Sequence, residues 1–489
     1  MNKRKILLAA TLLIFISTIT FGQDTWDLQR CVEYAWANNI SVKQSDVQAR
    51  IAKVDLEQSK WAQYPSANFS TNTGLQFGRS IDPTTNQFTS NQLLYQGFNV
   101  NAGVTIFNWN RLKNNVISSQ YASKAAEADV EKARNDIALN VATFYLTVLL
   151  ARQQVDVARI QMEQTRSQMV ATRRKVDAGA LPEVDALTFE GQYASDSANY
   201  LSAQATADQN LLDLKGLLNI DASLPFDIET PPVAQIPIDP ILSLQPDIVY
   251  DIALKNQPAQ KANELRLRSF EASVKASKAN FYPTISFGGS LGTNFASSNR
   301  QITGVDFLGY ESPSALSPVV DVGGTNYPVV SPIIVPVQGK KTFGQLWKGW
   351  GTQLDNNFRQ NIGLTISVPI LNGGAAKFNY ERSKLMLKNV QVTKEQIDQT
   401  LKNDIYKAYY SAMAAVQKFN ATKATVAATQ KTYDFALKRY DLGLLSTFDL
   451  ITSQNNLTRA KLDLATSEFD YVFKMKVLEF YKGQGIRLQ

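Results

Sequence analysis

The chain has 489 residues, a formal charge of +7 and 44% hydrophobic residues, which suits a folded protein with a sizeable core. It contains no histidine and one cysteine, Cys31, so histidine-dependent catalysis, a Cys/His metal site and a disulfide framework are excluded. The positive charge is too small over this length to indicate nucleic-acid binding. We therefore expect neither an enzyme nor a protein that holds a metal or another cofactor.

The first residues, 1–22, have the pattern of a secretory signal peptide. Basic residues precede the apolar run Ile6–Phe21, and the small residue Gly22 follows that run. The run is short for a membrane-spanning helix, so we expect cleavage after Gly22, with a retained anchor as the alternative. Cys31 lies beyond the run, and Arg30 occupies the position where lipid attachment needs a small residue. A buried helix thiol is therefore expected at Cys31.

The rest of the sequence contains an internal duplication. The segment Tyr34–Pro65 aligns without a gap on Ile252–Pro283. Further along the chain, identical residues pair as Asn108 with Asn372, Asp177 with Asp441, Gly179 with Gly443, Leu181 with Leu445, Asp185 with Asp449 and Thr188 with Thr452. The offset between the copies increases between Gly292 and Asn361, so the second copy carries an insertion there. Each copy is predicted to contain a helix, two strands, a very long helix, a turn and a final helix.

This duplication predicts two repeats, 23–224 and 247–489, joined by the connector 225–246. The connector is rich in proline, so we expect an extended, stiff segment with no folded element. The β-hairpins are expected at 66–107 and 284–371. The second hairpin includes the insertion, whose prolines predict a long external loop.

Four segments of the two hairpins alternate between apolar and small polar residues, starting at Ser66, Phe98, Ile285 and Asn361. Successive side chains of a strand point to opposite faces, so each segment has an apolar face and a face of Ser, Asn, Gly, Thr and Gln with almost no charge. The segments run to about ten residues, as tilted strands that cross a bilayer do, and the polar face suits a water-filled lumen. A half-buried sheet in a soluble sandwich is the alternative interpretation.

Four strands cannot close into a barrel by themselves. In lipid, an open sheet edge leaves backbone groups unpaired, so a membrane sheet needs strands from other copies of the chain. Three copies supply twelve strands, and closure alone also permits a dimer.

Long stretches without glycine or proline follow the hairpins, beginning near Arg111 and Ala375. As helices, each extends on the order of 100 Å and needs partners along its length. Alanine and aliphatic residues recur at spacings of three and four, which is typical of coiled-coil packing. A coiled-coil rod explains these helices but not the strands.

Each long helix ends at a glycine, Gly179 or Gly443, a residue that accepts the positive φ of a helix C-terminus. Pro182 and Ser446 suit the first positions of the returning helices. We therefore expect tight hairpin tips at 179–182 and 443–446.

Three motifs recur in the same order in known proteins. They are the opening Leu28…Ala35…Asn38-Asn39, which is repeated in the second copy, the Tyr-Pro pair before each first strand, and the stretch Arg439–Gly443 followed by Asp449-Leu450. The mature chain resembles the TolC family of outer-membrane efflux and secretion channels. The resemblance implies an α+β membrane protein that assembles as a homotrimer. It implies a twelve-stranded β-barrel in the outer-membrane bilayer, four strands per chain, continuous with a long α-helical barrel in the periplasm.

The function implied by the resemblance is a passive, gated duct that exports small molecules or polypeptides. An inner-membrane pump of the RND or ABC type and a periplasmic adaptor, or membrane fusion protein, would deliver the substrate. One alternative is a periplasmic coiled-coil scaffold or adaptor without a pore. Another is a surface receptor that uses the proline-rich external loop.

The resemblance also implies functional residues, because in this family the hairpin tips contact the adaptor and close the tunnel. The matching tip residues are Gly179, Ala180, Leu181, Gly443, Leu444, Leu445 and Ser446. Asp185 and Asp449 match the aspartates of the family's pore constriction, and Tyr440 matches a gate tyrosine. In a trimer, a ring of three aspartates would attract cations to the pore. The alternative is that each aspartate only stabilises its own helix: a negative charge in the first turn interacts favourably with the helix dipole by about 0.3–1 kcal/mol. Leu445 replaces a gate arginine, so the family's closing network cannot form here in the same way.

Overall fold

The computed structural model describes residues 25–81, 86, 88–89, 92–230 and 236–483. The expected signal peptide, 1–22, lies outside the described residues. The chain divides into two compact units. Among the described residues, 25–57, 116–274 and 381–483 contribute to the helical unit, and 58–115 and 275–380 contribute to the strand unit.

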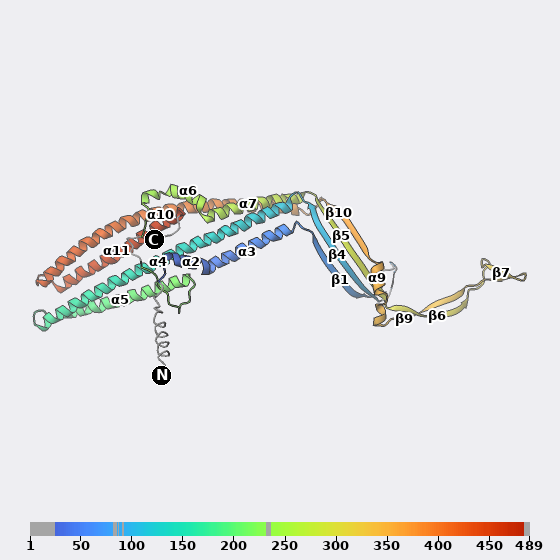
Figure 1. Cartoon of the computed structure of the whole chain (residues 1–489), viewed down its shortest axis with the longest axis horizontal. Helices are drawn as coiled ribbons and strands as arrows, with labels where there is room; N and C mark the ends of the chain where they lie inside the picture. The colour runs from blue at the N-terminus through green and yellow to red at the C-terminus, as the bar shows by residue number, and fades with distance from the viewer. Residues whose placement is uncertain (1–24, 82–85, 87, 90–91, 231–235, 484–489) are drawn as a thin grey trace, which may run out of the picture. The chain divides into compact units, whose positions relative to one another are not determined.

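The helices repeat in length between the two copies (Figure 1). The first copy contains α2 (Leu28–Asn38), α3 (Ile40–Trp61), α4 (Arg111–Asp177) and α5 (Glu183–Leu217). The second contains α6 (Pro246–Asn256), α7 (Pro258–Lys278), the short 3-10 helix η3 (Ala279–Phe281), α10 (Ala375–Asp441) and α11 (Thr447–Tyr481). The long helices α4 and α10 have 67 residues each, and the returning helices α5 and α11 have 35 each. This equality supports the internal duplication.

Each copy opens with two short helices where the sequence predicted one, because a single extended residue interrupts them. Asn39 has ψ 134° and Gln257 has ψ 126°. Gln257 precedes Pro258, which disfavours helical backbone in the residue before it. The Asn39 side chain accepts a hydrogen bond from the Ser41 N–H at 2.9 Å and so caps the second helix.

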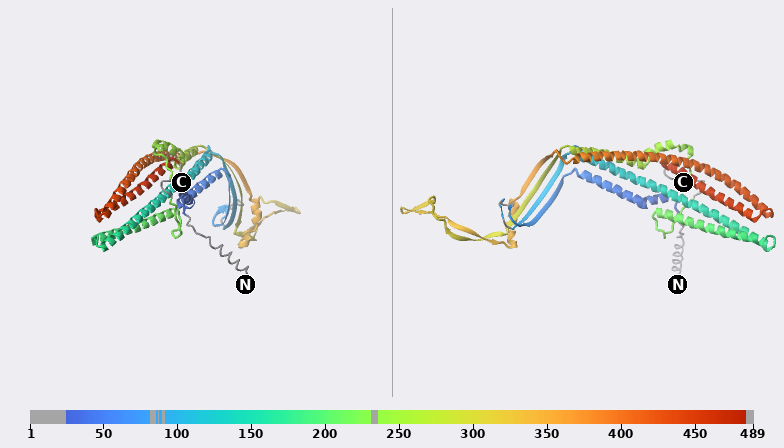
Figure 2. Two further views of the ribbon diagram at one scale, coloured as in Figure 1. Left: turned by 60° about the vertical axis from the view of Figure 1, so that its left-hand side comes forward. Right: turned by 180° about the vertical axis from the view of Figure 1, so that it is seen from behind.

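The core of the helical unit lies between the long helices and their returning partners. In both views of Figure 2, α4 runs beside α5 and α10 runs beside α11. One buried cluster surrounds Val141, Tyr145 and Leu149 of α4. A second cluster joins Ile405 and Ala412 of α10 to residues of α6 and α11. The alanines allow close approach of neighbouring helix backbones, as their spacing predicted.

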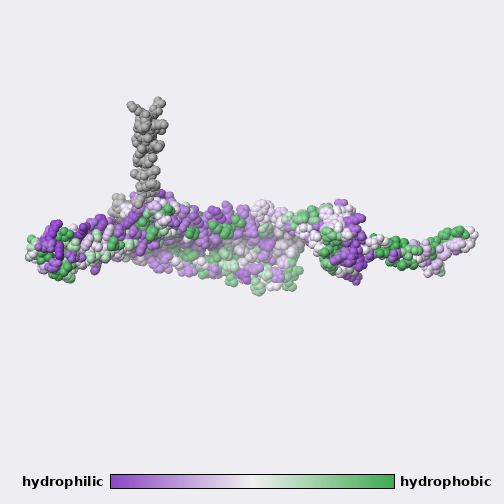
Figure 3. Space-filling view, turned by 90° about the horizontal axis from the view of Figure 1, so that it is seen from below, coloured by the Kyte–Doolittle hydropathy of each residue, from purple (hydrophilic) through white to green (hydrophobic). Residues whose placement is uncertain are grey.

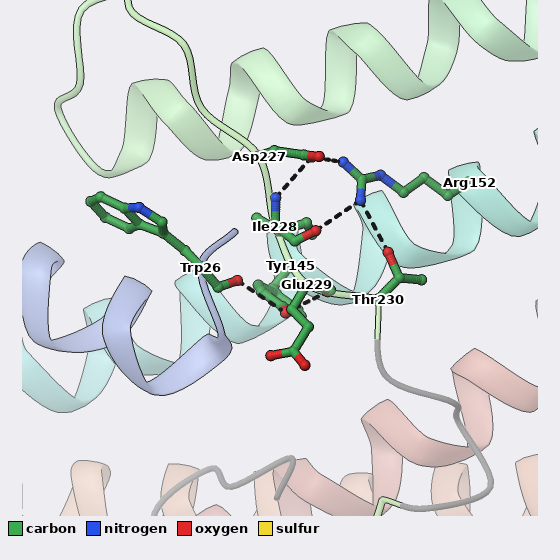
Figure 4. Close-up of polar contacts among 7 residues, drawn as sticks. All are labelled: Trp26, Tyr145, Arg152, Asp227, Ile228, Glu229 and Thr230. Atoms are coloured by element: carbon green, nitrogen blue, oxygen red, sulfur yellow. Dashed lines mark hydrogen bonds and ion pairs between the residues drawn. The ribbon is translucent and has the colours of Figure 1, made fainter. Parts of the chain in front are cut away.

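The sequence predicted an extended, stiff connector with no folded element, and in the structure its residues 227–230 pack onto α4. Trp26 and Ile228 form a parallel β-bridge, and the Glu229 N–H donates to the Trp26 carbonyl at 2.9 Å. The hydroxyl of the buried Tyr145 lies 2.7 Å from the Glu229 carbonyl oxygen and 3.3 Å from that of Trp26 (Figure 4). Burial raises the pKa of this hydroxyl well above its usual value.

Arg152, two turns along α4 from Tyr145, holds the same segment. Its guanidinium donates to the Ile228 carbonyl at 2.9 Å and to Thr230 Oγ1 at 3.0 Å, and it pairs with the Asp227 carboxylate (Figure 4). Further along the connector, Leu244 follows the 3-10 helix η2 (Ile241–Ser243) and is fully buried. Apolar residues between the prolines therefore fold this segment onto the helices, since their burial removes apolar surface from water.

The strand unit contains a four-stranded antiparallel sheet in the order β1 (Ser66–Gln76), β4 (Leu93–Phe107), β5 (Thr284–Ser298) and β10 (Arg359–Ser367). Each copy contributes a pair of strands, and β4 of the first copy pairs with β5 of the second. In this register, residues that the sequence placed on the same face lie side by side across all four strands. One cross-strand row contains Ala67, Ala102, Gly289 and Ile362, and the next contains Asn68, Asn101, Ser290 and Asn361.

The turns from the sheet into the long helices are equivalent in the two copies. Trp109 and Asn110 have φ of 53° and 61°, and the corresponding Gly373 and Gly374 have 60° and 79°. Glycine accepts this left-handed backbone readily, whereas a bulky residue such as tryptophan adopts it only where surrounding contacts hold it. The aromatic neighbours of Trp109, described below, supply such contacts.

The insertion of the second copy forms short elements where the sequence predicted only a loop. They are β6 (Arg300–Tyr310), β7 (Val319–Val322), β8 (Thr325–Pro328), β9 (Pro332–Lys340), α8 (Phe343–Leu346) and α9 (Trp350–Asn356), and the first hairpin adds β2 (Ser80–Ile81) and β3 (Phe88–Thr89). Phe295, expected on the exposed apolar face, is fully buried because its ring stacks on Trp347 at 5.5 Å between centroids.

Cys31 lies in α2 and has no exposed surface, as expected for a buried helix thiol. Burial raises its pKa to about 12. At pH 8 we expect iodoacetamide to label the native protein about 100-fold or more slowly than the urea-unfolded chain, because the thiolate is the nucleophile. Raising the pH from 7 to 9 should accelerate labelling of both forms, because the thiolate fraction of each rises with pH, and the native chain should remain the slower of the two. Mass spectrometry of the single cysteine measures both rates, and equal rates would show that α2 leaves the core.

Candidate functional site: sheet faces and helix tips

The apolar face of the sheet is exposed over most of its extent. Phe69 of β1 is 64% exposed and Leu364 of β10 is 60% exposed. Val100, Phe287 and nearby small residues of this face line a shallow apolar groove of about 370 Å³. Such a continuous apolar surface indicates contact with an apolar environment. None of the helices in the described residues is both long and apolar enough to cross a membrane.

The opposite face of the sheet is a close-packed array of amides, hydroxyls and glycines. A Cβ atom at Gly97 would lie 2.5 Å from the Asn72 side-chain oxygen, so a larger residue there would displace the Asn72 amide. This face also includes Arg359, whose guanidinium donates to the Asn294 side chain at 2.8 Å. The sequence analysis did not predict Arg359 on this face, because the predicted strand began two residues later, at Asn361. Apart from this arginine, the face matches the uncharged polar surface that the sequence predicted.

Aromatic residues, most of them exposed, gather at the end of the sheet that connects to the helices. The contacting ring pairs are Trp61 with Tyr64, Phe107 with Trp109, Trp109 with Tyr282, and Phe281 with Tyr380, at 4.8–5.8 Å between centroids. Tryptophan and tyrosine prefer the boundary between hydrocarbon and water. We did not predict this aromatic belt from the sequence, although the clustering of aromatic residues where strands meet helices was a usable signal.

The two helix tips have the same backbone geometry. Gly179 and Gly443 both have φ 72°. The N–H of the following residue, Ala180 or Leu444, donates to a carbonyl five residues earlier at 2.8 Å in both tips. This Schellman arrangement ends the long helices and turns the chain sharply. Gly179, Ala180, Gly443, Leu444 and Ser446 are exposed, whereas Leu181 and Leu445 are half-buried.

The predicted constriction residues lie just beyond these tips. Asp185 is half-buried in the first turn of α5, and Asp449 is exposed in the first turn of α11. Ser446 Oγ accepts a hydrogen bond from the Asp449 N–H at 3.1 Å and donates to its carboxylate at 2.7 Å. This capping pair supports the helix-dipole role of Asp449 and leaves the carboxylate accessible to solvent.

Tyr440 does not join either aspartate. Its hydroxyl lies 3.2 Å from Thr172 Oγ1 of α4, and its ring contacts Phe189 and Lys175. In the described part of the chain, no hydrogen bond links Tyr440 to Asp185 or Asp449. Tyr440 therefore connects the two hairpins, α4–α5 and α10–α11, through Thr172, a partner that the sequence did not indicate.

Further polar contacts hold the same region together. Arg173 pairs with Glu183 at 2.6 Å across the first tip, and this hydrogen bond raises the arginine pKa. Tyr433 of α10 is buried, and its hydroxyl accepts from Gln164 and Gln168 of α4 at 3.1 Å and 2.9 Å. These contacts fix the relative position of the hairpins within one chain. No group of three or more Cys, Asp or Glu in the described residues is suited to hold a metal ion.

The model of the outer membrane efflux protein family matches residues 32–219 and 340–474, most of the chain. This chain belongs to the outer membrane efflux protein family. The family consists of transport channels of the outer membrane. The unmatched residues 220–339 include the connector and nearly all of strands β6–β9.

Relatives span nearly the whole length of this efflux-family chain. Toxin and drug export protein A of Aggregatibacter actinomycetemcomitans is 18% identical over 445 residues, which cover 91% of this chain and 83% of that protein. Outer membrane efflux protein BepC of Brucella suis is 22% identical over 477 residues, covering 95% and 87%. The crystal structure of the Campylobacter jejuni CmeC outer membrane channel matches with a TM-score of 0.67 and 17% identity, covering 94% of this chain and 86% of that one. The fold is therefore that of these channels.

Proposed function

We propose that three copies of this chain form the passive, gated outer-membrane duct of a tripartite efflux or type I secretion system. The observation that carries the proposal is the four-stranded sheet, whose outer strands β1 and β10 each leave one edge unpaired among the described residues. In a bilayer those edges must pair, and three copies supply a closed barrel of twelve strands. The apolar face then contacts lipid, the polar face lines the lumen, and the aromatic belt lies at the membrane boundary.

The proposed duct is passive, and its transported substrate is supplied by partners. A periplasmic adaptor would contact the tips Gly179–Leu181 and Gly443–Ser446, and an RND or ABC pump in the inner membrane would provide the energy. The name of the A. actinomycetemcomitans relative covers both toxins and drugs. By that likeness, we extend the proposed substrates of this duct to small molecules and polypeptides.

We further propose that each chain contributes two repeats, 23–224 and 247–489, joined by the connector 225–246. The equal helix lengths and the equivalent turns support this division. In the trimer, the repeats would supply six similar hairpins around one axis, with a tip on each hairpin.

The mass of the detergent-extracted protein, together with its conductance in a planar bilayer, tests the proposed duct. We expect three chains per particle and discrete ion-conducting channels. A soluble monomer or dimer released with the periplasm would overturn the proposal and favour the scaffold without a pore.

A gate at the tips predicts a defined electrical phenotype. The double variant Asp185→Ala with Asp449→Ala is expected to raise resting conductance or to lower the cation-over-anion permeability ratio roughly two-fold, because three carboxylates per ring attract cations. Single-channel recording measures both quantities.

Asp208→Ala is the matched control, since it removes an exposed carboxylate of α5 away from the tip. It should leave conductance and selectivity unchanged. If the double variant also leaves both unchanged but lowers thermal stability, the aspartates act only on their helix dipoles, and the gate role is wrong.

A further inference from the structure

The ribbon of strands β6 and β9, extended by the β7–β8 turn, exposes apolar side chains on both of its faces. In the register, Phe307 lies opposite Ile334 on one face, and these side chains are 58% and 52% exposed. On the other face, Leu308 and Val335 are 65% and 44% exposed, and Val335 lies opposite Asp306. Figure 3 shows hydrophobic residues along this ribbon. A hairpin in water usually has one polar face, produced by alternating apolar and polar residues. This ribbon exposes apolar side chains on both faces instead.

The composition of the ribbon also favours a contact site. Between residues 301 and 339 the only charged residues are Asp306, Glu311 and Asp321. A two-stranded hairpin is marginally stable in water by itself, and contiguous apolar surface of this kind marks a contact site. The Gly323–Gly324 turn, with φ of 65° and 90°, gives the outer hairpin a defined end. The ribbon is therefore a formed element that needs a cover on each face.

The edges of the ribbon indicate how that cover is arranged. Pro332 and Pro336 lie in β9 and have no N–H to donate, which protects that edge against an added strand. The partner therefore packs against the side chains of the faces, where Phe307 and Val335 lie, more readily than it extends the strand ladder at β9.

We propose that the ribbons of the three copies pack against one another by their apolar faces, which would form a cap on the strand end of the duct. This inference rests on the proposed trimer. Around a threefold axis each ribbon has two neighbours, and each ribbon has two apolar faces. A neighbouring ribbon has the same length and equally few charged residues, so one neighbour can cover each of the two faces.

The chain connections favour this occupant. Strand β6 begins two residues after β5 ends, and the Lys341 N–H donates to the Asn299 carbonyl at 2.7 Å, which ties the base of the ribbon together. After β9 the chain returns through α8 and α9 to the edge strand β10. Closure of the barrel at β1 and β10 thus gathers the three ribbon bases and raises the effective concentration of one ribbon for another.

A lipid surface fits the ribbon less well. It would cover one face and leave the other in water. Lipid headgroups are also recognised by lysine and arginine, and the two basic residues of the ribbon, Arg300 and Lys340, pair in the register at its base, away from the apolar faces.

Cysteine cross-linking in isolated outer membranes tests this packing. In a Cys31→Ala background, Phe307→Cys and Val335→Cys place one thiol on each face of the ribbon. With a short bismaleimide, we expect the double variant to give covalent dimers and trimers, because around a threefold axis the Phe307 face of one ribbon meets the Val335 face of the next. Each single variant should give few cross-links. Ile334→Lys should reduce cross-linking of the double variant about five-fold or more, because a charge is costly in an apolar contact. Ser331→Lys adds the same charge without removing an apolar side chain and should have a small effect.

A second set of thiols separates this proposal from the trimer on which it rests. Asn68→Cys in β1, combined in turn with Asn361→Cys, Gly363→Cys or Thr365→Cys in β10, reports barrel closure on the polar face. Cross-linking of one such pair without cross-linking of the ribbons would overturn the ribbon packing and leave the duct intact. Ribbon thiols protected from a water-soluble maleimide but not cross-linked would indicate burial in lipid and also overturn it. Loss of both sets of cross-links would overturn the trimer itself.

Discussion

Leu364→Arg is expected to prevent assembly in the outer membrane, whereas Thr365→Arg, the next residue of β10, is expected to assemble. Leu364 shares the apolar face with Phe287, its partner in the register, and Thr365 shares the polar face with Ser286. An arginine on the lipid face costs about 2–4 kcal/mol near the middle of the bilayer. A trimer contains three such arginines, so the total cost is roughly 6–12 kcal/mol if the sites are independent.

The amount of heat-resistant trimer recovered from outer membranes measures this effect. We expect little or none for Leu364→Arg and near-normal amounts for Thr365→Arg. The surviving Thr365→Arg channels should shift towards anion selectivity, since the added charge lies in the lumen. Equal recovery of the two variants would mean that the sheet faces are assigned wrongly, whatever the oligomeric state.

The second large effect is expected at Arg152, which holds the connector on α4. Arg152→Met removes the hydrogen bonds to Ile228 and Thr230 and leaves the Asp227 carboxylate, 33% exposed, without its cation. Hydrogen bonds to charged groups contribute about 1.5–3 kcal/mol, so we expect a loss of about 2–3 kcal/mol in local stability. The connector should then detach from α4 more often than in the native protein.

Thermolysin cleavage within 225–246 reports that detachment, because the segment contains several isoleucines and leucines. We expect cleavage of Arg152→Met to be faster than that of the native chain. Arg159→Met is the matched control, seven residues further along α4, where the arginine makes only 3.4 Å ion pairs with Asp156 and Glu163 on an exposed surface. Surface pairs are worth about 0–1 kcal/mol, so this variant should be cleaved almost as slowly as the native chain. Similar cleavage of the two variants would contradict the role of Arg152.

For the site, the sequence located the tips and the aspartates but not their contacts. The positions of Asp185 and Asp449 in the first turns of the returning helices follow from their spacing to Gly179 and Gly443, because a helix turn is local, whereas their constriction role is what the family resemblance implies. The bond of Tyr440 to Thr172 joins residues that are 268 positions apart, and nothing in the local pattern specifies that partner. Arg359 was missed for a related reason: tertiary pairing with β5 extends β10 beyond the segment that alternates.

The sequence by itself determined the features that depend on neighbouring residues. The repeated glycines ended the long helices, because they adopt positive φ, and the alternation of side chains defined the two faces of every strand. Only the tertiary structure decided how these parts combine: the pairing of β4 with β5, the packing of the connector on α4, the burial of Phe295 under Trp347 and the pairing of β6 with β9 in a ribbon. The physical reason is that backbone conformation and side-chain alternation are local properties, whereas the choice of packing partner depends on burial between segments far apart in the chain.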